Sequence, residues 1–286
     1  MGTDGTAGAQ GRVTLATIAD VVGVSRATVS NAYNHPERLS PQLRARVLRT
    51  AQELGYAGPD PVAATLARGR IAALGLILED PMSFAFTDPA AVLFLQGVTE
   101  VCERESLALV LIPGPTSPTA RVALVDGVIC YCDLPDDGAL ATIRERQLPF
   151  VVVDGPPHPG AGHVGIDDRA GAYAAARHLL DLGHTRIGIV PMPLHDDGRE
   201  GEPSAGRQAT TYYFGTRERL VGYRAAVEEA GLRWDGMAIE ERAPYGRDAG
   251  RRATAALLAR RPRPTAVLAM SDELAGGAVD AAADLG

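Results

Sequence analysis

Residues 15–34 read LATIADVVGVSRATVSNAYN, a stretch in which two short helical patterns flank a glycine. Apolar residues recur at helical spacing at Leu15, Ile18, Ala19 and Val22. This spacing predicts an amphipathic helix over 15–22, with Thr14 as its N-cap. Gly23 ends that helix, because glycine adopts the left-handed backbone conformation that a tight turn requires.

A second helix is predicted over 26–33, where Ser25 is the N-cap. Val29 and Ala32 fall on the inward side of this helix. The side chains that remain on its outward side are Arg26, Ala27, Ser30 and Asn31. Two short helices joined by a tight glycine turn form a helix-turn-helix, and the second helix of that motif fits the major groove of DNA.

The outward side chains suit contact with DNA. Arg26 can donate to guanine or to phosphate, and Asn31 can pair with adenine. The hydroxyls able to donate to phosphate oxygens belong to Ser25, Thr28 and Ser30. Ala27 can meet only a thymine methyl group. On these residues alone, a small helical hairpin with ordinary caps remains an equal alternative.

The same stretch resembles, nearly position by position, the DNA-binding headpiece of the LacI/GalR family of bacterial transcription regulators. The matching residues are Thr14-Leu15, Ile18-Ala19, Gly23-Val24-Ser25, Thr28-Val29-Ser30 and Asn34, followed by Ser40, Val47 and Leu54-Gly55-Tyr56. The resemblance implies that Thr14, Asn34 and Tyr56 join the outward residues in contacting DNA. Many members carry a basic residue where this chain has Asn31, so the bases of the half-site cannot be taken from the family.

Charge is distributed unevenly along the chain of 286 residues, whose formal net charge is −7. Residues 1–70 hold eight arginines against five acidic residues, a balance of +3, so the remainder carries −10. A basic first part on an acidic body lets one end meet phosphate while the rest repels it. The sequence shows neither an apolar run long enough to cross a membrane nor a signal peptide, so we expect a cytoplasmic protein associated with the nucleoid.

A third helix and a linker are predicted to complete the DNA-binding part. The helix opens at Ser40-Pro41, runs to about residue 54 and directs arginines outward. These are Arg44, Arg46 and Arg49. Residues 57–61 form a stiff linker, and 62–68 a helix of about two turns that is marginal alone. The family resemblance implies that this helix orders on DNA and pushes Leu66 between base pairs in the minor groove. The alternative places Leu66 against the body of the protein.

From residue 72 onward, strand and helix patterns alternate. The predicted strands are 73–78, 107–112, 127–131, 150–153, 187–190 and 266–270. The predicted helices are 90–105, 139–146, 170–182, 217–230, 249–260 and 273–284. Such alternation predicts doubly wound parallel sheets with helices on both faces, an α/β architecture behind the all-α headpiece.

Four phrases of this α/β region also resemble the effector-binding core of the LacI/GalR family. They are residues 125–129, 149–154, 178–188 and 271–277. That core is similar to a periplasmic binding protein, in which two α/β lobes surround a small-molecule cleft.

The resemblance implies a division of the chain into four parts. We expect a disordered tail at 1–12, a headpiece at 13–57, a hinge at 58–70 and a core at 71–286. The core comprises an N-lobe over 71–166 and a C-lobe over 167–286, with the crossing near Ile166-Asp167. The family continues beyond residue 286, so we expect an incomplete second lobe, as in a C-terminally truncated product.

Candidate effector-binding residues lie where ligands bind in an open parallel sheet, beyond the carboxyl ends of the strands. The polar residues at or just after strand ends are Asp80, Tyr131, Asp133, Asp154 and Asp272. The resemblance places an effector-contacting arginine at Arg219, and Phe84 and Phe86 are predicted to form apolar walls. Asp272 has an alternative role as a helix N-cap. Carboxylates and an arginine at one cleft indicate a sugar-like or nucleoside-like effector.

Three other features are predicted to carry no chemistry. Cys102, Cys130 and Cys132 are expected to be unlinked thiols. Residues 160–165 spell GxGxxG, but a loop precedes them and a strand follows, so we expect no dinucleotide site. The polar loop over 195–215 is expected to be a mobile flap or disordered. We predict no metal site and no cofactor.

Together these features predict a homodimeric transcriptional regulator, of the repressor kind, that binds pseudo-palindromic double-stranded operator DNA. A small-molecule effector bound between the lobes would control it. The alternative is a cytoplasmic small-molecule-binding module that acts on no DNA. An enzyme on the same scaffold is disfavoured, because the sequence offers no nucleophile with local support and no phosphate loop.

Overall fold

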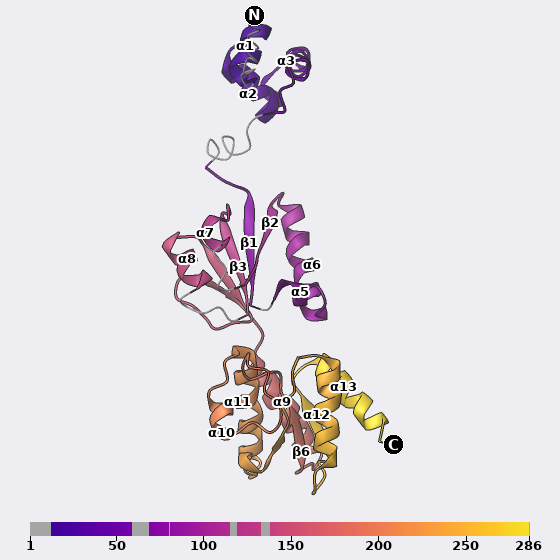
Figure 1. Cartoon of the computed structure of the whole chain (residues 1–286). Coiled ribbons are helices and arrows are strands. Elements are labelled where there is room, and N and C mark those ends of the chain that lie inside the picture. Colours follow the sequence, from indigo (N-terminus) through magenta and orange to yellow (C-terminus); the bar gives the residue numbers. More distant parts are fainter. Residues whose placement is uncertain (1–12, 59–68, 80, 115–118, 133–137, 286) are drawn as a thin grey trace, which may run out of the picture. The chain divides into compact units, whose positions relative to one another are not determined.

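The computed structural model describes residues 13–58, 69–79, 81–114, 119–132 and 138–285. The predicted tail at 1–12 and the helix predicted at 62–68 lie outside these residues. The chain consists of two compact units, Met1–Ile71 and Ala72–Gly286, which Figure 1 colours along the sequence.

The first unit is a small helical domain. Its elements are α1 (Leu15–Val22), α2 (Arg26–Asn34), the 3₁₀ turn η1 (Pro36–Arg38) and α3 (Pro41–Glu53). Thr14 and Thr17 form a capping box at the start of α1, and Gly23 ends that helix in the left-handed conformation with φ 75°. The buried core of the unit consists of Ile18, Ala19, Val22, Val29, Ala32, Val47 and Ala51. The predicted helix-turn-helix is therefore present with its predicted inward side.

Two arginines of α3, Arg44 and Arg46, are exposed as expected and also bond to the other two helices. Arg44 donates its Nε–H to the carbonyl oxygen of Ala32 at 3.2 Å, near the end of α2. Arg46 donates an Nη2–H to the carbonyl oxygen of Val22 at 2.6 Å, at the end of α1. The last carbonyls of a helix lack partners within it and carry partial negative charge, so guanidinium groups bind there favourably. These arginines tie α3 to both helices of the motif.

The second unit begins with a parallel five-stranded sheet. Its strands run in the order β2 (Ala108–Ile112), β1 (Ala73–Leu78), β3 (Gly127–Tyr131), β4 (Phe150–Val153) and β5 (Gly162–Val164). Figure 1 shows α6 on one side of this sheet and α7 and α8 on the other. The helices of this part are α5 (Met82–Ala85), α6 (Pro89–Arg104), α7 (Thr119–Val122) and α8 (Ala139–Glu145). Strand β5 comes from the GxGxxG stretch, which opens no helix and therefore lacks the context of a dinucleotide site.

A second parallel sheet follows along the chain, with strand order β7 (Ala238–Ile239), β6 (Ile187–Val190) and β8 (Ala266–Ala269). The helices around it are α9 (Asp168–Asp181), α10 (Ala205–Ala209), α11 (Phe214–Glu229), α12 (Arg247–Ala259) and α13 (Asp272–Ala283). A 3₁₀ turn, η2 (Trp234–Gly236), precedes β7. Helices α9 and α11 lie together on one side of the sheet, and α12 and α13 lie together on the other (Figure 1). The chain passes from the first sheet to the second between β5 and α9.

Both helix pairs approach closely through glycines. A Cβ on Gly222 of α11 would collide with the carbonyl oxygen of Arg169 on α9. A Cβ on Gly277 of α13 would collide with the carbonyl oxygen of Arg247 on α12. Neither helix pair could adopt its separation with a larger residue at that point.

The segment at 195–215 is ordered and bonded to residues around the second sheet, so the expectation of a mobile flap or a disordered loop is wrong. It contains α10, and Arg207 on that helix donates to both oxygens of the buried Glu241 carboxylate at 2.8 and 2.9 Å. The same guanidinium pairs with Asp197 at 2.8 and 2.9 Å. Glu241 also accepts the backbone N–H of Leu194 at 2.8 Å. Sequence alone gave no sign of this order, because the partners lie 34 residues apart.

A buried hydroxyl on α12 gives a test of this packing. Thr254 is 1% exposed, and its Oγ1 has no hydrogen-bond partner among the described residues. We predict that Thr254→Val raises the free energy of unfolding by about 1 kcal/mol, because valine has the same shape without the unsatisfied hydroxyl. Thr211→Val is the matched control, since Thr211 Oγ1 donates to the Gln208 carbonyl at 2.7 Å. It should lower that free energy by about 1 kcal/mol in urea unfolding. Destabilisation by Thr254→Val would contradict the packing described.

Candidate functional site

The outward side of α2 carries the residues predicted to contact DNA. Arg26 and Ala27 are exposed, and Asn31 is partly exposed, while Val29 and Ala32 on the opposite side are fully buried. The buried side fixes the rotation of α2 about its axis. It therefore decides which side chains the helix presents to a partner.

The polar side chains predicted to contact DNA also form hydrogen bonds within the helix that carries them. Ser25 Oγ accepts the backbone N–H of Thr28 at 3.1 Å and lies 2.8 Å from Thr28 Oγ1. Asn34 donates its Nδ2–H to the carbonyl oxygen of Ser30 at 3.2 Å and to its hydroxyl at 3.3 Å. Their capping and bracing geometry keeps α2 rigid. The role of each in DNA contact stays a prediction.

Two more residues of the predicted DNA-binding set lie away from α2. The ring of Tyr56 packs edge-on against that of Tyr33, with centroids 6.0 Å apart, at the rim of the headpiece core. Thr14 caps α1. Leu66 lies outside the described residues.

A cavity of about 870 Å³ lies at the carboxyl ends of the strands in the second unit. Residues that follow strands of both sheets line the cavity, and its volume is in the range of small-molecule sites. Four of the predicted effector residues are on its wall: Phe84, Tyr131, Asp154 and Arg219. Asp80 and Asp133 lie outside the described residues.

Two predicted effector residues are not on the cavity wall. Phe86 follows α5 with its side chain turned to solvent, 58% exposed, while Phe84 lines the cavity. Asp272 is the first residue of α13, and Ser271 before it supplies both the wall and the N-cap, accepting the backbone N–H of Leu274 at 3.3 Å. The N-cap alternative for Asp272 is therefore wrong by one residue. The serine hydroxyl reaches the helix N–H groups from the cap position.

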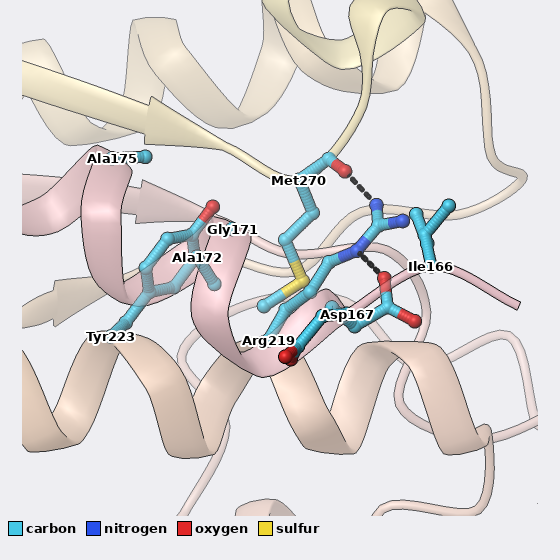
Figure 2. Close-up of a pocket in the computed structure, with 9 residues that line it drawn as sticks. Ile166, Asp167, Gly171, Ala172, Ala175, Arg219, Tyr223 and Met270 are labelled. Atoms are coloured by element: carbon cyan, nitrogen blue, oxygen red, sulfur yellow. Dashed lines mark hydrogen bonds and ion pairs between the residues drawn. The ribbon is translucent and has the colours of Figure 1, made fainter.

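Asp168 lines the cavity but was not among the predicted effector residues. Its carboxylate is buried at the start of α9 and accepts the Nε–H of Arg219 at 2.7 Å. Arg219 also donates to the carbonyl oxygen of Met270, just past β8 (Figure 2). A second pocket, of about 220 Å³, adjoins this pair and includes Tyr223 in its wall. The N-cap of α9 is Asp167, which accepts the N–H of Ala170 at 2.9 Å, so the adjacent acid is left for the arginine.

Asp154 lies near the point where the chain crosses between the sheets, and its surroundings disfavour the charged form of its carboxyl. Its backbone has φ 55°, a left-handed conformation that aspartate tolerates better than most residues. Burial and the negative charge of Asp168 raise the pKa of its carboxyl above the ordinary value. A hydrogen bond from the Ile166 backbone and the charge of Arg219 act in the opposite direction. Asp154 thus keeps a proton more readily than a solvated aspartate does.

Aromatic rings form much of the remaining wall. Phe84 packs edge-on against Tyr245, with centroids 6.0 Å apart, and Tyr131 stacks on Phe94 at 4.3 Å. Tyr245 donates its hydroxyl to Ser271 Oγ at 3.0 Å, and burial raises the pKa of that phenol. Tyr213, at the N-cap of α11, lines the cavity as well. Tyr213 and Tyr245 were not predicted, because each follows a loop whose path the sequence pattern did not define.

The described residues offer little support for other chemistry. No group of three or more potential metal ligands is present in that part of the chain. None of the described helices is both long and apolar enough to span a bilayer. Cys130 is buried within β3, and burial raises the pKa of its thiol to about 12. That thiol is therefore a poor nucleophile near neutral pH.

Comparison with known proteins places both units. Residues 14–58 match the family described as bacterial regulatory proteins of the lacI family, and residues 176–286 match a periplasmic binding protein-like domain. The chain is 41% identical over 277 residues to the HTH-type transcriptional regulator Rv3575c of Mycobacterium tuberculosis, covering 94% of this chain and 77% of the relative. The chain belongs to the LacI family. It is a DNA-binding transcriptional regulator with a periplasmic-binding-protein-like core.

Other relatives extend this assignment. The regulator IpsA of Corynebacterium glutamicum is 37% identical over 279 residues, covering 93% of this chain and 77% of that protein. A crystal structure of a LacI family regulator from Corynebacterium glutamicum matches with a TM-score of 0.66 and 35% identity, covering 96% of this chain and 80% of that one. The expectation of a truncated product is not borne out by these matches.

The raised pKa of Asp154 leads to a pH-dependent prediction. The folded state holds this proton more tightly than the unfolded state does, so stability falls as pH rises from the ordinary pKa through the folded pKa of this carboxyl. We predict that Asp154→Asn raises the melting temperature of the core at pH 7 and that the difference vanishes below pH 3.8, the ordinary value. Asparagine keeps an acceptor oxygen and tolerates the positive φ. Calorimetry across this pH range measures the effect, and a difference that grows in acid would contradict it.

Proposed function

We propose that this LacI-family regulator is a homodimeric repressor that binds pseudo-palindromic double-stranded operator DNA and releases or retains it in response to a small molecule in the 870 Å³ cavity. One observation carries the DNA-binding part of the proposal. The buried pair Val29 and Ala32 fixes α2 so that Arg26, Ala27 and Asn31 face solvent on one rigid helical surface. We also propose that the protein acts in the cytoplasm, on the DNA of the nucleoid.

The DNA contacts follow from the shape of α2. Its outward side fits a major groove, with Arg26 and Asn31 able to read base edges and the hydroxyls of Ser25, Thr28 and Ser30 able to donate to phosphates. Thr14, Asn34 and Tyr56 are proposed to hold the backbone on either side. Leu66 is proposed to enter the minor groove at the centre of the operator and kink the duplex.

Two related structures support the remaining parts. The lac repressor, 21% identical with a TM-score of 0.68, was solved as a dimer bound to operator. The regulator CelR, 26% identical with a TM-score of 0.61, was solved in complex with cellobiose. Two headpieces held by a dimer would meet two half-sites, and an effector that prefers one arrangement of the lobes would shift the equilibrium between bound and released DNA.

A substitution on α2 tests sequence-specific binding. We predict that Asn31→Ala lowers affinity for a duplex selected from a random pool by about 10-fold to 100-fold, because one bidentate base contact is lost. Affinity for bulk DNA and its salt dependence should not change, since Asn31 carries no charge. Gln52→Ala, on the exposed surface of α3, is the matched amide control and should bind like the wild type. Electrophoretic mobility shifts measure both, and equal losses for specific and bulk DNA would contradict the base-reading role.

Removal of the cavity arginine tests effector control. We predict that Arg219→Ala keeps operator affinity but loses the response to whichever unphosphorylated sugar or nucleoside shifts the wild-type protein on DNA. Arg219→Gln guards against misfolding, because glutamine can still donate to the buried Asp168. Fluorescence anisotropy of labelled operator follows both variants. An undiminished response in the glutamine variant would remove Arg219 from the effector site.

A further inference from the structure

The cavity in the second unit has a strongly negative wall. Among the described residues that line it, Arg219 is the sole lysine or arginine. The carboxylates on the same wall are Glu79, Asp88, Asp154, Asp168 and Asp196. Low-dielectric walls that carry one sign of charge concentrate the electric field inside a cleft. The excess of carboxylates therefore favours uncharged or positive ligands and disfavours anions.

The charge of Arg219 is already matched within the protein. Its Nε–H is donated to Asp168 at 2.7 Å and an Nη1–H to the Met270 carbonyl oxygen. Phosphate and carboxylate ligands are recognised most strongly by an arginine that offers two parallel N–H groups. An anion in the cavity would compete with Asp168 for this guanidinium.

Two of the three helix N-termini on the cavity wall are capped by side chains of the protein. Asp88 accepts the N–H of Ala91 at the start of α6, and Ser271 accepts that of Leu274 at the start of α13. The first turn of α11 has no side-chain cap, but the carboxylate of Asp168 lies beside it. A Cβ built on Gly215 would be 3.6 Å from Asp168 Oδ2. The first turns of α6 and α13 therefore present their N–H groups to the protein's own side chains, and the first turn of α11 has a carboxylate beside it that would repel an anion.

The remaining wall suits an uncharged ring that carries hydroxyl groups. Phe84, Tyr131, Tyr213 and Tyr245 offer apolar faces. Asp154 and its neighbouring carboxylates accept hydrogen bonds from hydroxyl donors without being neutralised. The burial of Asp154 and its closeness to Asp168 already disfavour further negative charge there.

We propose that the cavity binds an uncharged, hydroxyl-rich ring compound and rejects the phosphorylated or carboxylated form of the same compound. This selectivity rests on the proposed effector function of the cavity. Its source is the pairing of Arg219 with Asp168, which leaves the wall with excess negative charge.

Matched ligand pairs test the proposal on the intact chain. The probes are D-glucose with D-glucose 6-phosphate and D-glucuronate, D-fructose with its 6-phosphate, D-ribose with its 5-phosphate, cellobiose with its 6-phosphate, and adenosine with its 5′-monophosphate. Isothermal titration calorimetry gives each Kd at low ionic strength, where charge effects are least screened. In every set with a binding member, the uncharged form should bind at least about tenfold more tightly. Equal or tighter binding of an anionic member, or no binding in any set, would overturn the proposal.

A charge-neutralising variant locates the effect. Asp154→Asn should reduce the preference for the uncharged form at least about threefold, since one carboxylate leaves the wall. Asp235→Asn makes the same change in an exposed ion pair outside the cavity wall and should leave the preference as it is. An unchanged preference in Asp154→Asn would also overturn the proposal.

Operator affinity, measured on the same preparations, separates this proposal from the proposed function. A phosphorylated ligand that binds best and still shifts the protein on DNA refutes the charge selectivity alone. Loss of preference for any selected duplex, with and without ligand, refutes the regulator function instead.

Discussion

A buried carboxylate at the start of α9 requires a cation, and Arg219 on α11 supplies it at 2.7 Å. Because an unpaired buried charge is costly, this pair fixes α11 against α9 and, through the Met270 carbonyl, against the end of β8. Gly222 permits the same arrangement, because the absence of a side chain there lets α11 approach α9 closely. The cavity wall follows from this constraint, since Asp154, Asp168 and Arg219 meet where the chain crosses from one sheet to the next.

The headpiece depends on a different and simpler constraint. Its buried residues fall on one side of each short helix, and two arginines of α3 close the carbonyl ends of α1 and α2. A rigid headpiece keeps Arg26 and Asn31 on one surface. Recognition of DNA by a short helix needs this rigidity, because base contacts are lost when the helix can rotate.

Much of this arrangement could be predicted from the sequence, because its signals are local. The helix ends are indicated by the capping residues Thr14 and Ser25 and by the turn glycine Gly23. The continuous apolar runs at 73–78 and 187–190 are typical of strands in parallel sheets. The features that escaped prediction depend on distant partners. Arg46 reaches Val22, Arg207 reaches Glu241, and Arg219 reaches Asp168, which lies 51 positions earlier in the chain. Partners so far apart in the chain leave no periodic pattern in the sequence.

The central claim is that α2 presents a sequence-reading surface to duplex DNA. Selection of bound duplexes from a random pool by the purified full chain, at modest ionic strength, tests it most directly. The account predicts enrichment of one sequence with two-fold symmetry, its half-sites spaced for two headpieces. Recovery of unenriched DNA, with and without added sugars and nucleosides, would contradict the account.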